Sequence, residues 1–99
     1  MIMVRETEKF SKWLRNLKDP VAQSLITARI RRISTGNFGD VKSLGDTVSG
    51  LRIDYGPGYR VYFTRCGGEI IILLCGGTKT TQIRNIETAQ RMVKNIEEI

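Results

Sequence analysis

The sequence contains no histidine, and this absence narrows the chemistry open to the protein. Histidine is the commonest general acid or base and the commonest metal ligand, so Ser-His and Cys-His nucleophile systems are excluded. A metal site would have to use carboxylates or thiolates, but the two cysteines, Cys66 and Cys75, lack the spacing of a zinc site. We therefore expect neither a bound metal nor a cofactor.

Long apolar stretches are also missing. The longest, Ile70 to Cys75, is far shorter than the ~20 residues that a membrane-spanning helix requires. The apolar residues 1–4 are followed at once by Arg5 and Glu6, which argues against a signal peptide. The sequence thus predicts a cytoplasmic protein without membrane contact, and its length predicts a single domain over residues 1–99.

Acidic residues are outnumbered by basic ones. Sixteen lysines and arginines against ten aspartates and glutamates give a net charge of +6 and an isoelectric point near 9.8. A small basic domain is attracted to polyanions, which include nucleic acid, an acidic protein segment and anionic lipid. Charge alone does not distinguish among these partners, and it is equally compatible with a soluble basic protein that binds none of them.

Apolar residues at helical spacing predict a helical hairpin over residues 7–35. The first helical stripe comprises Phe10, Trp13, Leu14 and Leu17. Proline disfavours helix at the preceding residue but suits a first turn, so Asp19 is expected to cap a second helix that starts near Pro20. A last helix is expected over residues 81–96, with an inward face of Ile83, Ile86, Ala89, Val93 and Ile96.

Strand patterns occupy the region between these helices. Residues 41–44, 48–55, 59–66 and 69–75 are predicted strands, and residues 1–4 are another. The predicted fold class is therefore α+β. Two N-terminal helices are expected to pack on a mostly antiparallel sheet of four to five strands, followed by the C-terminal helix.

The turns between strands predict a register. If Gly67-Gly68 closes a two-residue hairpin, the cross-strand pairs are Cys66 with Glu69, Tyr62 with Leu73, and Arg60 with Cys75. If Gly56-Pro57-Gly58 is a three-residue turn, the pairs are Tyr55 with Tyr59, Asp54 with Arg60, and Arg52 with Tyr62. The two cysteines would then lie roughly 20 Å apart, too far for a disulfide.

Alternation along the strands assigns each residue to a face of the sheet. The face expected beneath the helical hairpin carries Leu51, Ile53, Tyr55, Tyr59, Val61, Phe63, Ile70, Ile72 and Leu74. The opposite face carries Arg52, Asp54, Arg60, Tyr62 and Thr64, beside Ile71, Leu73 and Cys75.

The polar face predicts a phosphate-binding site. An ordinary Asp54–Arg60 ion pair would explain two of its residues and leave Arg52 and Tyr62 unexplained. In a phosphate site the arginine forks bind oxygens, the tyrosine stacks on a base and the carboxylate orients an arginine. Lys79, after the last strand, is placed to reach the same face. Without histidine, RNA cleavage there would need a lysine, tyrosine or carboxylate to move the proton.

Three segments resemble a known family. Residues 51–63 (LRIDYGPGYRVYF), 73–82 (LLCGGTKTTQ) and 36–44 (GNFGDVKSL) are similar to the phage-derived addiction module killer proteins, the HigB-like branch of the RelE/ParE superfamily. This resemblance implies a RelE-like, microbial RNase-like fold. By position in the motif, Arg52, Arg60 and Lys79 correspond to basic residues that hold mRNA in that family, with Tyr62 a weaker match. The last helix lacks the Tyr or His that many members carry near the C-terminus.

The resemblance also implies a function. It predicts the toxin of a type II toxin–antitoxin system, an endoribonuclease (mRNA interferase) that cleaves mRNA at the ribosome and inhibits translation. The implied partners are the ribosome, mRNA and a cognate antitoxin of the helix-turn-helix type, and operator DNA would be bound only through the toxin–antitoxin complex.

Two alternatives share the same scaffold. One is a ParE-like inhibitor of DNA gyrase, which acts by protein contact. The other is a non-catalytic interaction protein whose basic helices bind an acidic antitoxin. The basic residues of the predicted hairpin are Lys9, Lys12, Arg15, Lys18, Arg29, Arg31 and Arg32. They fit a solvated helix face, an antitoxin contact or a contact with ribosomal RNA.

Overall fold

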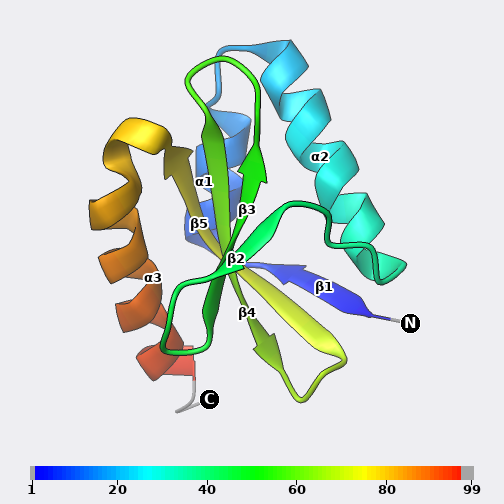
Figure 1. Cartoon of the computed structure of the whole chain (residues 1–99), viewed down its shortest axis with the longest axis vertical. Coiled ribbons are helices and arrows are strands. Elements are labelled where there is room, and N and C mark those ends of the chain that lie inside the picture. The colour runs from blue at the N-terminus through cyan, green and yellow to red at the C-terminus, as the bar shows by residue number, and fades with distance from the viewer. Residues whose placement is uncertain (1, 97–99) are drawn as a thin grey trace.

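The computed structural model describes residues 2–96 and has an α+β fold, as the sequence predicts (Figure 1). The strands are β1 (Met3–Glu6), β2 (Val41–Ser43), β3 (Val48–Ile53), β4 (Tyr59–Cys66) and β5 (Ile70–Thr78). The helices are α1 (Glu8–Arg15), α2 (Pro20–Ser34) and α3 (Gln82–Ile96), and the short 3-10 helix η1 (Lys79–Thr81) precedes α3. Within residues 2–96 no helix has the length and apolar character needed to cross a membrane.

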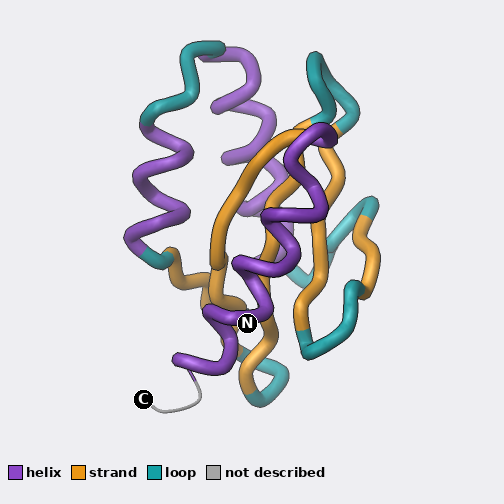
Figure 2. Tube along the Cα trace, turned by 90° about the vertical axis from the view of Figure 1, so that its left-hand side faces the viewer, coloured by secondary structure: helices purple, strands orange, loops and turns teal. Residues whose placement is uncertain are grey.

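The five strands form one sheet in the order β1-β5-β4-β3-β2. β1 runs parallel to β5, and the other neighbours are antiparallel. In Figure 2 the two N-terminal helices stand on one side of the strands and α3 passes in front of them. The helices therefore cover both faces of the sheet: α1 and α2 lie on one face, and α3 lies on the other.

Side-chain caps fix where the first two helices begin. The Thr7 hydroxyl accepts a hydrogen bond from the Phe10 amide at 3.1 Å. Asp19 accepts from the amides of Val21 and Ala22 at 2.9 and 3.4 Å, which confirms the predicted cap of α2. Asp19 also accepts a hydrogen bond at 2.8 Å from the hydroxyl of Tyr55, which ties the start of α2 to the β3–β4 turn.

Two apolar clusters lie on opposite faces of the sheet. The first lies under α1 and α2 and contains Phe10, Ala22, Ile26, Ile33, Leu51, Ile53, Tyr59, Val61, Phe63, Ile71 and Leu73. The second lies under α3 and contains Val48, Tyr62, Leu74, Cys75, Ala89 and Val93. The inward positions of Ala89 and Val93 are confirmed, but Ile83, which we predicted to face inward, is 78% exposed. It lies in the first turn of α3 on the side that faces solvent, whereas Thr81 and Asn85 of the same segment lie against Gly77 of β5.

The register between β3 and β4 differs from the predicted one. Arg52 lies opposite Arg60 and Ile53 opposite Tyr59, so the turn comprises residues 54–58 instead of three residues. The predicted pairs of Asp54 with Arg60 and of Arg52 with Tyr62 are therefore wrong. Because the shift is two residues, every side chain keeps the face that alternation assigned to it.

The register between β4 and β5 shifts by one residue, which has a larger effect. Cys66 lies opposite Ile70 instead of Glu69, because the loop takes residues 67–69. Beyond an irregularity at Tyr62/Phe63, Tyr62 lies opposite Cys75 and Arg60 opposite Gly77, in place of the predicted Leu73 and Cys75.

This one-residue shift exchanges the faces of the first half of β5. Ile71 and Leu73 pack under the helical hairpin, whereas Ile72 and Leu74 pack under α3, the reverse of the prediction. A strand that is apolar on both faces offers no alternation from which the register can be deduced. The predicted absence of a disulfide is confirmed, since Cys66 and Cys75 are free thiols.

Candidate functional site

An open, polar cleft of about 440 Å³ lies at the end of the sheet where β3 turns into β4. It is lined by Asp40, Arg52, Asp54, Gly56, Pro57, Gly58, Arg60 and Lys79. Four of the five residues predicted as a site, Arg52, Asp54, Arg60 and Lys79, are thus brought together. They come from β3, the β3–β4 turn, β4 and η1.

Arg52 and Arg60 are direct cross-strand neighbours. Like charges placed opposite each other in a sheet repel, so this arrangement needs a compensating anion. Asp40 supplies one: its Oδ1 accepts hydrogen bonds from Nε and one terminal nitrogen of Arg52 at 3.1 and 2.8 Å. Both side chains are about half exposed, so the pair contributes orientation more than stability.

The electrostatics of the pair follow from this contact. The hydrogen bond from Arg52 lowers the pKa of Asp40, and the nearby positive charges of Arg29 and Arg60 lower it further. The same hydrogen bond raises the pKa of Arg52. Both groups therefore stay charged over the physiological range.

Asp40 and Arg29 are residues that sequence reasoning missed as part of the site. Arg29, on α2, donates to the carbonyl oxygens of Arg52, Phe38 and Asp40 at 2.8, 3.2 and 3.3 Å. It thereby joins the segment before β2 to the end of β3. No periodic pattern marks either residue, because their hydrogen bonds join different segments of the chain rather than residues of one helix or strand.

Arg60 has unused hydrogen-bonding capacity. One terminal nitrogen donates to the Tyr59 carbonyl at 3.3 Å, while Nε is buried and has no hydrogen-bond partner among residues 2–96. Leaving a buried donor unpaired costs roughly 1–3 kcal/mol. The guanidinium is thus only partly satisfied by the protein and is placed to bind an anion in the cleft.

Gly58 gives the β3–β4 turn a left-handed residue beside Lys79 and Arg60. Its φ of +79° is in the left-handed region, and a Cβ there would lie 3.5 Å from Lys79 Cβ and 3.6 Å from an Arg60 terminal nitrogen. The Lys79 amide donates to the Gly58 carbonyl at 2.8 Å, which ties η1 to the turn. This contact explains how a residue after β5 joins the β3–β4 cleft.

Asp54 has a different environment from the predicted one. It is exposed in the turn, and the only ion pair found within residues 2–96 is that between Arg52 and Asp40. Asp54 is therefore a carboxylate that lines the cleft without being held by an arginine.

Tyr62 is not part of the cleft. Its side chain is 1% exposed and packs in the cluster under α3, so it cannot stack on a base as we predicted. Burial raises the pKa of its hydroxyl, which disfavours proton transfer through it. The prediction was wrong because α3 covers this half of the polar face, and strand alternation alone does not reveal that cover.

The cleft combines three cationic side chains with two carboxylates, one of them already paired. Such a surface suits a phosphodiester better than an isolated small anion, because the guanidinium forks and the ammonium can contact several oxygens. No group of three or more His, Cys, Asp or Glu side chains within residues 2–96 is arranged to hold a metal ion.

Fold and cleft together define a small α+β protein with a cationic site at one end of its sheet. No family model matches the sequence. An uncharacterized protein of Haemophilus influenzae is 45% identical over 95 residues, which cover 96% of each chain. The chain belongs to the same family as that protein.

Proposed function

We propose that this protein is the toxin of a type II toxin–antitoxin system and acts as a ribosome-dependent mRNA endonuclease, similar to the HigB-like branch of the RelE/ParE superfamily. The observation that carries the proposal is the gathering of Arg52, Arg60 and Lys79 with the unpaired Asp54 in one open cleft. These residues lie in or beside the sequence segments that resemble that family.

The cleft residues fit cleavage by the RNA's own 2′-hydroxyl. Arg60 and Arg52 bind the scissile phosphate and stabilise the negative charge that grows on it as the 2′-oxygen attacks phosphorus. Asp54 accepts the 2′-hydroxyl proton, and Lys79 donates a proton to the departing 5′-oxygen. The products are a 2′,3′-cyclic phosphate and a 5′-hydroxyl end.

The ribosome has a definite role in this scheme. An open cleft places little constraint on an RNA strand, so it has little means to impose the in-line geometry that the attack requires. We assign that task to the ribosome, which presents the mRNA in a distorted form. A cytoplasmic location, neutralisation by a cognate antitoxin and operator binding only through the antitoxin complex complete the proposal.

A cell-free translation assay tests the proposal. Purified protein is added to mRNA with and without ribosomes, and cut sites are mapped by primer extension. We expect cuts within codons only when ribosomes are present, and at least a hundredfold less cutting by Arg60→Ala, the range lost when one transition-state donor is removed.

The matched control is Arg91→Ala, which removes an equally charged, exposed arginine from α3, outside the lining of the cleft. It should cut like the unaltered protein, and circular dichroism should show that both variants fold. Intact mRNA together with accumulated gyrase–DNA breaks would refute the nuclease proposal and favour the gyrase inhibitor. Full activity of Arg60→Ala would show that the cleft is not the site.

A further inference from the structure

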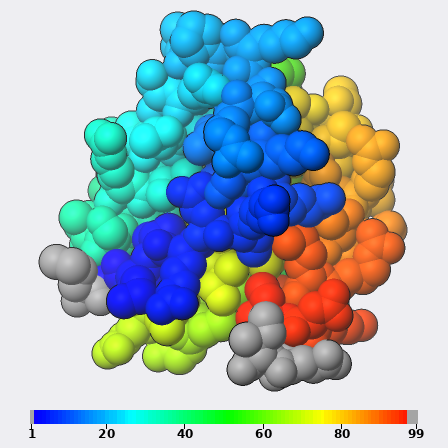
Figure 3. All heavy atoms as spheres, turned by 180° about the vertical axis from the view of Figure 1, so that it is seen from behind, coloured from blue at the N-terminus to red at the C-terminus, as the bar shows by residue number. Residues whose placement is uncertain are grey.

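A second groove, of about 560 Å³, lies between α1 and α3 along the last residues of β5. β1 pairs with β5 only as far as Leu73, so within residues 2–96 the rest of β5 has a strand neighbour on one side only. The helices α1 and α3 flank this free edge. Figure 3 shows the face on which α1, in blue, lies beside α3, in orange.

Two glycines make this groove possible. A Cβ on Gly76 would overlap the ring of Trp13 from α1, and a Cβ on Gly77 would overlap Asn85 and Thr81 on the other side. The Thr81 hydroxyl in turn donates to Asn85 Oδ1 and accepts from the Thr78 amide. Trp13 therefore packs directly against β5 on one side of the groove, and Asn85 and Thr81 do so on the other. This close packing is possible because Gly76 and Gly77 carry no side chain.

The lining of the groove is cationic and partly aromatic. Lys9, Lys12 and Arg84 are exposed around it, and no carboxylate belongs to its described lining. Trp13 is partly exposed and presents its ring there, held by contacts with Phe10 and Tyr59 at centroid distances of 5.7 and 6.4 Å. A held aromatic ring between cations is the arrangement that binds single-stranded nucleic acid.

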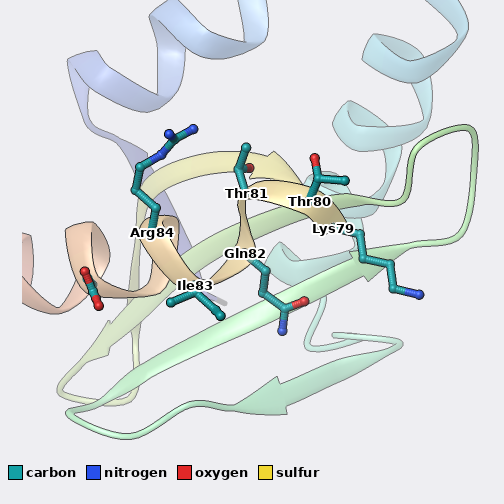
Figure 4. Close-up of a pocket in the computed structure, with 7 residues that line it drawn as sticks. Lys79, Thr80, Thr81, Gln82, Ile83 and Arg84 are labelled. Carbon is teal, nitrogen blue, oxygen red and sulfur yellow. The ribbon is translucent and has the colours of Figure 1, made fainter.

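The groove is continuous with the cleft around η1. A hollow lined by residues 79–84 and Glu87 shares Lys79 with the cleft and shares Thr81 and Arg84 with the groove. In Figure 4 the side chains of Lys79 and Arg84 leave opposite ends of this segment in opposite directions. Ile83, 78% exposed, offers an apolar surface between them.

We propose that the groove between α1 and α3 binds the nucleotides that adjoin the scissile phosphate, so that one RNA strand runs from the cleft over η1 into the groove. This inference rests on the proposed function for the identity of the strand. Lys9, Lys12 and Arg84 contact its phosphates, and a base stacks on Trp13. Continuity with the cleft favours RNA over an acidic peptide, which would need no connection between the two sites.

The chain's single tryptophan lies in this groove, so its fluorescence reports occupancy directly. The probe is a 2′-O-methyl RNA of about 12 nucleotides, which cannot be cleaved by a 2′-hydroxyl and falls within the usual site sizes of single-strand binders. Binding should quench Trp13. The double variant Lys12→Ala/Arg84→Ala should bind about tenfold more weakly, with a salt slope smaller by about 1.4 because two phosphate contacts are lost.

The matched control is Arg91→Ala/Lys94→Ala, which removes two exposed charges of α3 outside the groove lining and should leave affinity and slope nearly unchanged. Circular dichroism establishes that all variants fold. An unquenched Trp13 at saturating RNA, or equal weakening by both double variants, would overturn the inference. Quenching by an acidic Glu/Leu peptide but not by RNA would overturn it too, and would assign the groove to a protein partner.

The two proposals fail separately. Suppose that the translation assay shows no ribosome-dependent cutting, while RNA still quenches Trp13 and Lys12→Ala/Arg84→Ala still binds RNA more weakly. That result would refute the nuclease proposal and support the RNA-binding groove. If the protein cuts mRNA within codons but the groove variants bind RNA with unchanged affinity, the nuclease proposal stands and the proposed RNA-binding role of the groove is refuted.

Discussion

Replacing Tyr62 by phenylalanine should stabilise this protein without impairing its activity. The Tyr62 hydroxyl is buried beneath α3 and has no hydrogen-bond partner within residues 2–96. An unpaired buried polar group costs roughly 1–3 kcal/mol, and phenylalanine keeps the ring while removing that group. We expect Tyr62→Phe to raise the free energy of unfolding by about 1 kcal/mol, the low end of that range, because a small void replaces the oxygen.

Urea denaturation followed by Trp13 fluorescence measures this change. For a slope of roughly 1–2 kcal/mol per M, 1 kcal/mol raises the midpoint by about 0.5–1 M with an unchanged slope. The thermal midpoint should rise by roughly 4–8 °C. If Tyr62→Phe is no more stable than the unaltered protein, the Tyr62 hydroxyl must have a hydrogen-bond partner. If Tyr62→Phe no longer cuts mRNA, Tyr62 must belong to the functional site after all.

The pH dependence gives an independent check. Burial raises the pKa of folded Tyr62 above its ordinary value of 10.0. The folded protein therefore holds this proton more tightly than the unfolded chain does. The associated stability is fully present below pH 10 and is lost as the pH rises through the folded pKa. Phenylalanine does not titrate, so the advantage of Tyr62→Phe should widen above pH 10, and a constant difference would contradict the cause assigned to the shift.

Two further predictions concern the geometry of the cleft. Gly58→Ala should destabilise the fold by roughly 1–2 kcal/mol, because it places a side chain on a left-handed residue. It should also reduce cutting, because the strained turn carries the Gly58 carbonyl that accepts the Lys79 amide. Gly67→Ala, at φ +63° and outside the lining of the cleft, should lose similar stability with full activity, and equal activity of the two variants would contradict this role of the β3–β4 turn. Asp40→Asn should reduce cutting by about tenfold, less than Arg60→Ala, because Arg52 loses the charged partner that orients it. Since the pKa of Asp40 is lowered in the fold, its contribution to stability is present above pH 3.8 and is lost as the pH falls through its folded pKa, so acid denaturation curves of Asp40→Asn should lack that component.

Local patterns were sufficient for the elements of the fold. The Asp19-Pro20 pair defines the start of α2 through side-chain hydrogen bonds to amides two and three residues away, which needs no distant partner. Alternation placed Leu51, Ile53 and Val61 under the helical hairpin, and a two-residue error in the turn left that assignment intact. The pattern failed at β5, where apolar residues in succession fit either face and one extra loop residue exchanged Ile71 and Leu73 with Ile72 and Leu74.

For the site, the sequence by itself determined which charges are available and that Arg52, Arg60 and Lys79 belong to one region, because strand alternation and short turns restrict where they can lie. Only the tertiary structure decided their partners. Asp40 reaches Arg52 because β2 pairs with β3, and Tyr62 is buried because α3 folds back over half of the sheet. Each contact joins two different elements, and such contacts depend on how whole elements pair and pack, which the periodicity within one element does not encode.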